Sequence, residues 1–301
     1  MRILVTGAAG YIGSALVRAL GETNVLATDQ TSVPFAHGVV GNIAYPQFAR
    51  SLITPEIDVV FHLAALVSGG AEQNFELGMK VNFDATRDLL EACRLAGNCP
   101  KFLFASSIAV YGGALPDPVT DETPPAPRIS YGAQKLMCEV LLDDYSRRGY
   151  VDGRALRLPT VMVRPGSANT AVSGWTSALI REPLGGRDYV CPVRPDTRMA
   201  CISVGRVVQC FRRMAELPAS ALGERRTVLL TGIPASAQQM WDAVKPRATG
   251  GVRFEPDARL QAIMDSVPKA TYSARAAVLG LPHSTAIDEI VREYEEAALA
   301  I

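Results

Sequence analysis

The chain has 301 residues, of which 48% are hydrophobic and 20% are charged, and its 30 basic and 30 acidic side chains cancel. This composition is typical of a globular enzyme with a large core, and the balanced charge argues against nucleic acid or an anionic membrane as a partner. The first apolar run follows Met1-Arg2 directly, and no apolar run is long enough for a membrane span, so we expect a cytoplasmic protein without a signal peptide.

Cysteine and histidine usage gives no sign of a disulfide framework or a metal centre. The six cysteines contain no Cys-x-x-Cys pair, which indicates reduced thiols. His37, His62 and His283 are far apart in the sequence, so we expect no metal site. His62 lies within an apolar run, where a packed histidine is a more common role than a proton relay.

The N-terminal segment carries the pattern of a dinucleotide-binding turn. An apolar run is followed by Gly7, Gly10 and Gly13 and then by helix formers, which predicts a strand, a tight turn and a helix N-terminus. Glycines let backbone amides approach a pyrophosphate, whose charge the helix dipole favours. The next predicted strand ends at Asp29, where this kind of fold places an acid against the adenosine ribose. An ordinary glycine turn is the weaker alternative, because it leaves Asp29 unexplained.

Asp29 also distinguishes between the two nicotinamide cofactors. Its carboxylate repels a 2′-phosphate, and no arginine follows it immediately to compensate. The sequence therefore predicts NAD rather than NADP.

Predicted strands and helices alternate from here to about residue 165. We expect a strand at 39–40, a helix over 46–52, a strand over 57–65, a long helix over 72–95, a strand over 101–105, a proline-rich loop over 112–128, a helix that Ser130 caps and that reaches 148, and a strand over 154–158. This alternation predicts an α/β fold with an open, doubly wound parallel sheet and helices on both faces.

The pattern becomes irregular after Arg164. We expect a short helix that ends near 181–186, a helix over 204–216, a strand over 227–231, a helix that begins at Ser236, a strand over 252–254 and a last helix over 285–299. The predicted domains are an NAD-binding Rossmann domain over 1–165, to which 200–232 returns, and a small substrate-binding domain over 166–199 and 233–301.

A second motif, Tyr131-Gly-Ala-Gln-Lys135, lies at the start of a predicted helix. Residues four apart project from the same helix face, so the ammonium lies near the phenol. A phenol has an ordinary pKa of about 10 and becomes a useful base only where cations stabilise its phenolate. The hydroxyl of Ser107, at the end of an earlier strand, is placed to hold a substrate oxygen beside Tyr131. A solvated helix face is the usual explanation of such a pair, but the glycine turn, Asp29 and the upstream serine together argue against it.

Together these motifs resemble the extended short-chain dehydrogenases/reductases, the NAD-dependent epimerase/dehydratase group. The resemblance covers residues 1–165, with further motifs at 61–65 and 106–112. It implies a catalytic triad of Ser107, Tyr131 and Lys135, a supporting helix asparagine at Asn82, and a homodimer formed through two long helices. The implied contacts with NAD come from Gly7, Gly10, Tyr11, Ile12, Gly13, Asp29, Asn42, Ile43, Leu63, Ala64, Ala65, Asn82, Tyr131, Lys135, Pro159 and Val161, with Asn42 at a position where the family often has aspartate.

Segments further along resemble one branch of that family more narrowly. Residues 68–72, 77–79, 157–166, 181–184 and 195–198 are similar to the D-erythronate dehydrogenase branch, which oxidises a four-carbon sugar acid at C2 to a 2-oxo acid. The predicted substrate-binding residues are Ser68, Ser107, Tyr131, Thr160, Asn169, Ser173 and Arg181.

Arg181 is the predicted partner of the substrate carboxylate, because a guanidinium matches a carboxylate with two parallel hydrogen bonds. It closes a short helix beside a loop rich in serine and asparagine at 167–173. Arg164 and Arg198 are the alternatives, and a surface ion pair is the explanation without a function.

The leading hypothesis is an NAD-dependent oxidoreductase that acts on a secondary hydroxyl of a small sugar acid. In it, Tyr131 takes the hydroxyl proton, Ser107 positions the oxygen, and Lys135 lowers the tyrosine pKa and binds the cofactor ribose. A nucleotide-sugar epimerase or dehydratase with tightly bound NAD is the alternative, although the 137 residues after Arg164 are few for gripping a nucleotide diphosphate as well. A catalytically silent redox sensor is disfavoured, because both Tyr131 and Lys135 are present.

Overall fold

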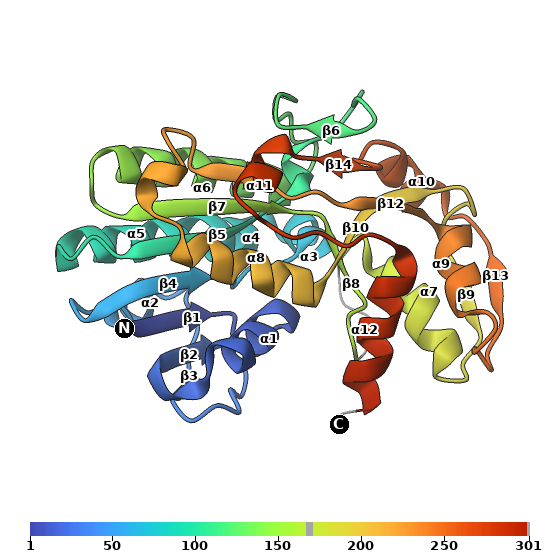
Figure 1. The fold of residues 1–301 in the computed structure, drawn as a ribbon, viewed down its shortest axis with the longest axis horizontal. Coiled ribbons are helices and arrows are strands. Elements are labelled where there is room, and N and C mark those ends of the chain that lie inside the picture. The colour runs from blue at the N-terminus through green and yellow to red at the C-terminus, as the bar shows by residue number, and fades with distance from the viewer. Residues whose placement is uncertain (167–170, 300–301) are drawn as a thin grey trace.

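The computed structural model describes residues 1–166 and 171–299. Within them, a seven-stranded sheet forms the centre of the protein, and its neighbouring strands all pair in parallel. Along the sheet the strands lie in the order β11 (Thr227–Leu229), β7 (Asp152–Leu158), β5 (Lys101–Ser107), β4 (Ile57–His62), β1 (Arg2–Thr6), β2 (Val25–Asp29) and β3 (Gly38–Val40). The predicted α/β fold with a doubly wound parallel sheet is confirmed (Figure 1).

The order of the strands reverses at β1. The strands β2 and β3 lie on one side of β1, and β4, β5, β7 and β11 lie on the other. In open parallel sheets, ligands bind beyond the carboxyl ends of the strands at such a reversal. The glycine turn after β1 and the segment after β4 both lie at this place.

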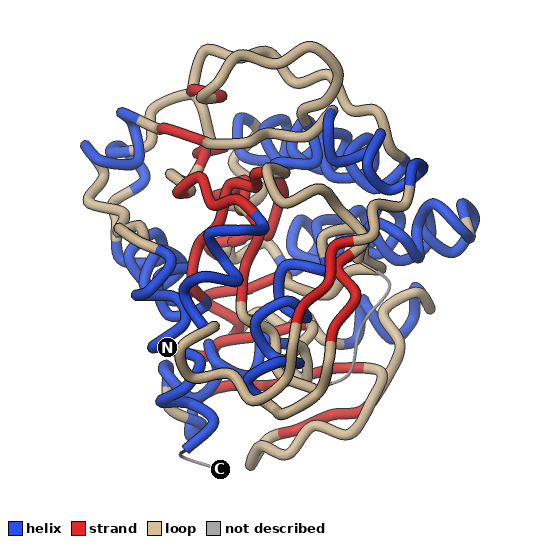
Figure 2. Tube along the Cα trace, turned by 90° about the vertical axis from the view of Figure 1, so that its right-hand side faces the viewer, coloured by secondary structure: helices blue, strands red, loops and turns tan. Residues whose placement is uncertain are grey.

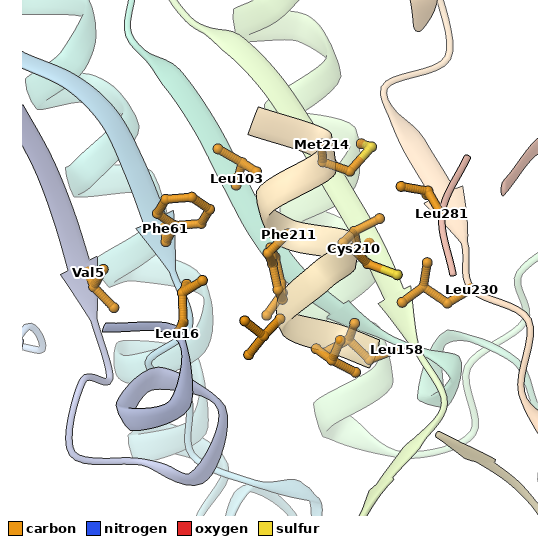
Figure 3. Packing of buried hydrophobic residues seen from close by; sticks show 14 of the residues in the cluster. Val5, Leu16, Phe61, Leu103, Leu158, Cys210, Phe211, Met214, Leu230 and Leu281 are labelled. Carbon is orange, nitrogen blue, oxygen red and sulfur yellow. The ribbon is translucent and has the colours of Figure 1, made fainter. Parts of the chain in front are cut away.

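Helices cover both faces of the central sheet. On one face, α1 (Tyr11–Leu20) packs beside α8 (Val204–Glu216). Figure 3 shows Phe211 of α8 facing the strands, and its ring meets the Phe61 ring edge to face with 6.2 Å between the centroids. The opposite face is covered by α2 (Pro46–Ser51), α5 (Ala85–Ala96) and α6 (Ser130–Arg147). Because α8 and β11 share a buried cluster with the N-terminal elements, this later part of the chain folds onto the first.

A further buried cluster lies in the remaining part of the described chain. Its strands form a three-stranded sheet in the order β12 (Ile233–Ser236), β10 (Arg198–Ser203) and β8 (Thr160–Met162), and a pair of β13 (Val252–Phe254) with β9 (Tyr189–Cys191). Its helices are α7 (Gly174–Leu184), α9 (Ala237–Val244), α10 (Ala258–Asp265) and α12 (Ile287–Leu299). Figure 2 looks onto this end of the protein, where β9 and β13 run side by side.

The proline-rich loop over 112–128 contains a short strand that the sequence did not predict. This strand, β6 (Val119–Thr120), pairs with β14 (Thr271–Tyr272), which α11 (Ala274–Val278) follows. Asp121 accepts hydrogen bonds from the Ser273 hydroxyl at 2.7 Å and the Arg275 amide at 3.1 Å. The loop is therefore tied to the C-terminal part of the chain.

The predicted long helix over 72–95 is confirmed from Phe75 onwards but is wrong at its start. The segment forms α3 (Ser68–Gln73), α4 (Phe75–Gly78), a π-helix over Met79–Asp84, and then α5. The break lies at Asn74, whose backbone leaves the helical region and whose side chain accepts a hydrogen bond from the Leu77 amide at 2.9 Å. A short polar side chain that caps the next helix competes with continuation of the previous one.

The start of α6 also differs from the prediction that Ser130 caps it. Ile129 is the cap residue, and the Ser130 amide donates to Oε2 of Glu72 at 2.9 Å. A carboxylate at a helix N-terminus satisfies a free amide and complements the dipole. Although α6 has 18 residues, neither it nor another helix of the described ranges is long and apolar enough to cross a membrane.

Candidate active site

A cavity of about 420 Å³ opens at the carboxyl ends of the central strands. It extends from the glycine turn after β1, past the ends of β2, β4 and β5, to α10. Most residues predicted for the site line it: Gly7, Gly10, Ile12, Gly13, Asp29, Asn42, Ile43, Leu63, Ala64, Ala65, Ser68, Ser107, Tyr131, Lys135, Pro159, Thr160, Val161 and Ser173. Tyr11, Asn82 and Arg181 are not part of its wall, and Asn169 lies outside the described residues.

The glycine turn leaves room for backbone atoms alone. Gly7 has a φ of +71°, and a Cβ there would lie 2.7 Å from the Ala64 nitrogen. A Cβ on Gly13 would lie 2.0 Å from the Gly7 carbonyl oxygen, so glycine is required for α1 to start against the turn. The amides at the start of α1 have no partner earlier in the helix, and together with the helix dipole they suit a pyrophosphate.

Asp29 lies beside this turn at the end of β2. Its carboxylate accepts hydrogen bonds from the Ala9 amide at 3.1 Å and from the amide and hydroxyl of Thr31, both at 3.3 Å. These bonds hold the acid at the edge of the cavity, where a carboxylate can accept hydrogen bonds from ribose hydroxyls. The turn, the acid and the small side chain of Ala64 therefore fit a dinucleotide.

Ser107, Tyr131 and Lys135 come together further along the cavity. Ser107 is the last residue of β5, and the other two lie one turn apart near the start of α6. The Lys135 ammonium is 5.6 Å from the centroid of the Tyr131 ring and 4.5 Å from that of Phe104. The neighbouring Ser106 instead donates its hydroxyl to the buried carboxylate of Glu139.

Burial shifts the pKa values of both functional groups on α6. It raises the pKa of Tyr131 to about 12, while the charge of Arg164 and hydrogen bonding with Ser107 act in the opposite direction. It lowers the pKa of Lys135 to about 8, against the effects of Cys138 and Glu139. A phenol with this pKa is protonated at neutral pH, so Tyr131 needs more positive charge nearby to act as a base. Such shifts in a cleft are typical of functional sites.

Asn82 supports the cavity from behind its wall. The side chain accepts from the Leu66 amide at 2.8 Å, and its Nδ2 donates to the Leu66 carbonyl at 3.0 Å and to the Gln134 side chain at 2.7 Å. Leu66 lines the cavity, whereas Asn82 is buried within the π-helix. π-Helical turns are frequent at functional sites. The geometry gives Asn82 a supporting role and no direct contact with the cavity.

His62 is buried with both ring nitrogens hydrogen-bonded. The Thr86 hydroxyl donates to the Asn82 carbonyl, so it accepts from Nε2 of His62, 2.9 Å away. Nδ1 then accepts from the Thr6 hydroxyl at 2.7 Å. Burial, and to a smaller extent the charge of Lys135, lowers the pKa of His62 to about 3. The prediction of a packed histidine is confirmed.

The geometry does not support Arg181 as the partner of a substrate carboxylate. Its guanidinium is buried away from the cavity, where it donates to the Arg164 carbonyl and to the Glu182 carboxylate, each at 2.8 Å. Arg198 pairs with Asp117 and does not line the cavity either. Each of these two guanidinium groups is already paired with a carboxylate of the protein, so neither is placed to bind the carboxylate of a substrate in the cavity.

Arg164, one of the two alternatives, does line the cavity. Its guanidinium carbon lies 5.8 Å from the centroid of the Tyr11 ring. Within residues 1–166 and 171–299, no carboxylate lies within ion-pair distance of this guanidinium. It is therefore a cation at the cavity wall that is open to an anionic ligand.

Apolar residues of α10 and the segment after it form a part of the wall that the sequence did not predict. Ile263, Met264, Val267 and Pro268 line the cavity, and the Trp175 indole donates to the Met264 sulfur at 3.2 Å. These residues are far in sequence from every motif, and an ordinary amphipathic helix carries no sign of what it covers. Sequence reasoning had no signal that could have found them.

Comparisons with known proteins agree with this geometry. The model of the NAD dependent epimerase/dehydratase family matches residues 3–227. D-erythronate dehydrogenase from Cupriavidus necator is 42% identical over 100% of both chains, and D-erythronate dehydrogenase from Haemophilus influenzae is 36% identical over 98% of this chain and 99% of the relative. The crystal structure of the nucleoside-diphosphate-sugar epimerase from Agrobacterium tumefaciens is 34% identical, with a TM-score of 0.92 over 100% of this chain and 95% of that chain. The family match, the strand order and the cofactor cradle together show that this chain belongs to the NAD dependent epimerase/dehydratase family.

Proposed function

We propose that this protein is an NAD-dependent dehydrogenase that oxidises a secondary hydroxyl of a small sugar acid, converting a D-erythronate-like 2-hydroxy acid to a 2-oxo acid. The observation that carries the proposal is similarity along the whole chain to two proteins named D-erythronate dehydrogenase. The cavity adds support, because Tyr131, Lys135, Ser107 and Arg164, which has no ion-pair partner among the described residues, border one space.

In the proposed reaction, Tyr131 takes the proton of the substrate hydroxyl and Ser107 holds the hydroxyl oxygen. The charge of Lys135 stabilises the Tyr131 phenolate, and Arg164 adds a second positive charge to the same wall. The amides of the glycine turn bind the pyrophosphate of the cofactor, and Asp29 binds its ribose. When bound, NAD supplies the hydride acceptor.

Arg164 replaces Arg181 as the proposed partner of the substrate carboxylate. Its charge acts on Tyr131, so a carboxylate bound to it lies beside the reacting hydroxyl, as in a 2-hydroxy acid. Burial lowers the pKa of Arg164, and a charge that is poorly solvated gains from an anionic partner. The polar side chains of Ser68, Thr160 and Ser173 line the same cavity and are proposed to bind the other hydroxyls.

A nucleotide-sugar epimerase is the second candidate, because the Agrobacterium structure carries that name. The two candidates differ in the fate of the cofactor. A screen of four- to six-carbon aldonic and uronic acids should give net NADH formation, with D-erythronate among the substrates. If the protein interconverts nucleotide sugars without net NADH formation and oxidises none of the acids, the epimerase is the correct function and the dehydrogenase proposal is wrong.

We also propose a homodimer formed through α4 and α6. These helices pack together and expose Phe75, Leu77, Met137 and Val140, with Val140 65% exposed. Exposed apolar side chains of this kind favour a partner surface, and the resembling family pairs the outer faces of the long helices that hold Asn82 and Lys135 as a four-helix bundle. Light scattering should show a dimer for the wild type and a monomer for Val140→Glu. Val278→Glu, at an 87% exposed position on α11, is the matched control and should remain dimeric. A wild-type monomer would overturn this assembly.

The proposed domain division follows the buried clusters. One cluster joins the strands of the first 158 residues to α8 and β11, another packs α2, α5 and α6 on the opposite face of the same sheet, and a third unites α7, α9 and α12 with β10. All six cysteines are free, and five are buried, which favours the cytoplasm as the compartment. Limited proteolysis checks the first proposal by cutting between the clusters, and cell fractionation checks the second.

A further inference from the structure

The ammonium of Lys135 has no partner of opposite charge at hydrogen-bond distance. Lys135 is 1% exposed, and in the part of the chain that the structure describes no ion pair or hydrogen bond joins its Nζ to a carboxylate. Its neighbours are the faces of the Phe104 and Tyr131 rings. A buried cation costs free energy unless a negative charge compensates it, so the source of that charge matters for the site.

Glu139 is the carboxylate that acts on this cation. It lies four residues after Lys135 on α6, on the same helix face and one turn further from Tyr131. It is buried at 3% exposure. Lys135 therefore stands between the tyrosine on one side and a carboxylate on the other.

The position of the Glu139 carboxylate is set by β5 and β7. Arg157 donates to it through Nε at 3.0 and 3.2 Å and through Nη2 at 2.6 Å. The hydroxyl of Ser106, next to Ser107, also donates to it. Arg157 in turn donates to the Tyr111 hydroxyl at 2.6 Å. β5 and β7 thus hold one carboxylate at a constant place behind Lys135.

We propose that Glu139 is a positioning residue that supplies the counter-charge of the Lys135 ammonium, and that Arg157 and Ser106 serve to fix its carboxylate. The role of the network in catalysis rests on the proposed function, because it acts through Lys135 on Tyr131. The charged and titratable groups that face Glu139 are Arg157, Tyr111, Lys135, Cys138 and Asp143.

Two substitutions break the same ion pair and separate this role from a structural one. In Glu139→Gln, the counter-charge is lost, so the titration midpoint of Lys135 should fall by about one pH unit. In Arg157→Gln, the Glu139 carboxylate remains but no longer has the guanidinium as a partner, so the titration midpoint of Lys135 should stay the same or rise. NMR of protein labelled with ¹³C at the lysine Cε position measures both midpoints, with Lys135→Arg used for assignment. This readout needs no substrate.

Kinetics extend the test to the reaction. The rising limb of the pH profile of kcat/KM should move up in Glu139→Gln by about one unit, which is about a ten-fold loss below its midpoint. It should not move up in Arg157→Gln. The double variant Glu139→Gln/Arg157→Gln keeps hydrogen-bonding groups at both positions but has no charge on either. It should be more thermally stable than the single variants, and its pH profile of kcat/KM should keep the raised midpoint of Glu139→Gln.

The proposal would be overturned if the titration midpoint of Lys135 shifted equally in the two single variants. It would also be overturned if the double variant had the wild-type midpoint for Lys135. If a single variant does not fold, the double variant decides. If Lys135 shows the expected midpoints but the protein oxidises no sugar acid, the role of Glu139 as counter-charge would stand and the proposed dehydrogenase function would be wrong.

Discussion

The guanidinium of Arg164 lies over the ring of Tyr11, with 5.8 Å between its central carbon and the ring centroid. Tyr11 begins α1, directly after the glycine turn, and Arg164 follows β8. The contact therefore joins the cofactor side of the cavity to its substrate side. Cation–π contacts of this kind contribute about 0.5 to 2 kcal/mol, depending on how far they are removed from water.

Tyr131→Phe tests the proposed base. The change keeps the ring and removes the proton acceptor, so turnover of the sugar acid should fall by about two to four decades. NAD binding, measured by calorimetry, should be largely retained, because the glycine turn and Asp29 are unchanged. Wild-type turnover in this variant would mean that another residue takes the proton.

Steady-state kinetics with both cofactors test the role of Asp29. Its carboxylate already accepts hydrogen bonds from Ala9 and Thr31, so its position beside the turn is constrained. A 2′-phosphate at this place meets a negative charge, and we expect a clear preference for NAD over NADP. Asp29→Asn should narrow the preference by raising the efficiency with NADP. Equal efficiency of the wild type with both cofactors would contradict the assignment.

Arg164 and Arg181 form a matched pair for testing carboxylate binding. Arg164→Lys keeps the charge but loses the planar fork, so the KM for the acid should rise about ten-fold or more, with NAD binding unchanged. Arg181→Lys should leave that KM unchanged and lower the thermal midpoint, because Arg181 holds the Arg164 carbonyl and Glu182. A raised KM in Arg181→Lys with an unchanged KM in Arg164→Lys would identify Arg181 as the residue that binds the substrate carboxylate.

His62 should make the folded state less stable in acid. Its folded pKa of about 3 lies below the unfolded value of about 6.5, so the unfolded chain binds the proton more readily. Stability is therefore present above pH 6.5 and is lost as the pH falls from there towards 3, by about 1.4 kcal/mol per pH unit. His62→Gln should flatten this part of the curve in urea unfolding.

His37→Gln, at an exposed position, is the control for this measurement and should keep the wild-type slope. Because many carboxylates titrate below pH 5 in every variant, the difference between variants is the quantity to compare. Parallel curves for wild type and His62→Gln would show that His62 is also protonated when folded.

Local spacing in the sequence was sufficient for the parts of the site that short-range geometry controls. Glycines at 7, 10 and 13 imply a close backbone approach wherever they occur, and Tyr131 and Lys135 share a helix face because a helix repeats every 3.6 residues. Runs of apolar residues between turns then predict parallel strands, whose carboxyl ends must meet at one edge. The fold class, the glycine turn and the Tyr131–Lys135 pair follow from these rules, and the other predicted residues of the cavity wall came from the resemblance to the family.

Contacts between distant segments decided the rest, because no periodic pattern encodes them. Whether Arg164 or Arg181 faces the cavity depends on which one finds a partner, and Glu182 and a backbone carbonyl take Arg181. The closing of the cavity by α10 likewise depends on packing that carries no motif. The break at Asn74 is local, but it comes from a side-chain cap that the helical period does not show. The ion pair of Glu139 also joins distant segments, because Arg157 lies on β7, 18 residues further along the chain.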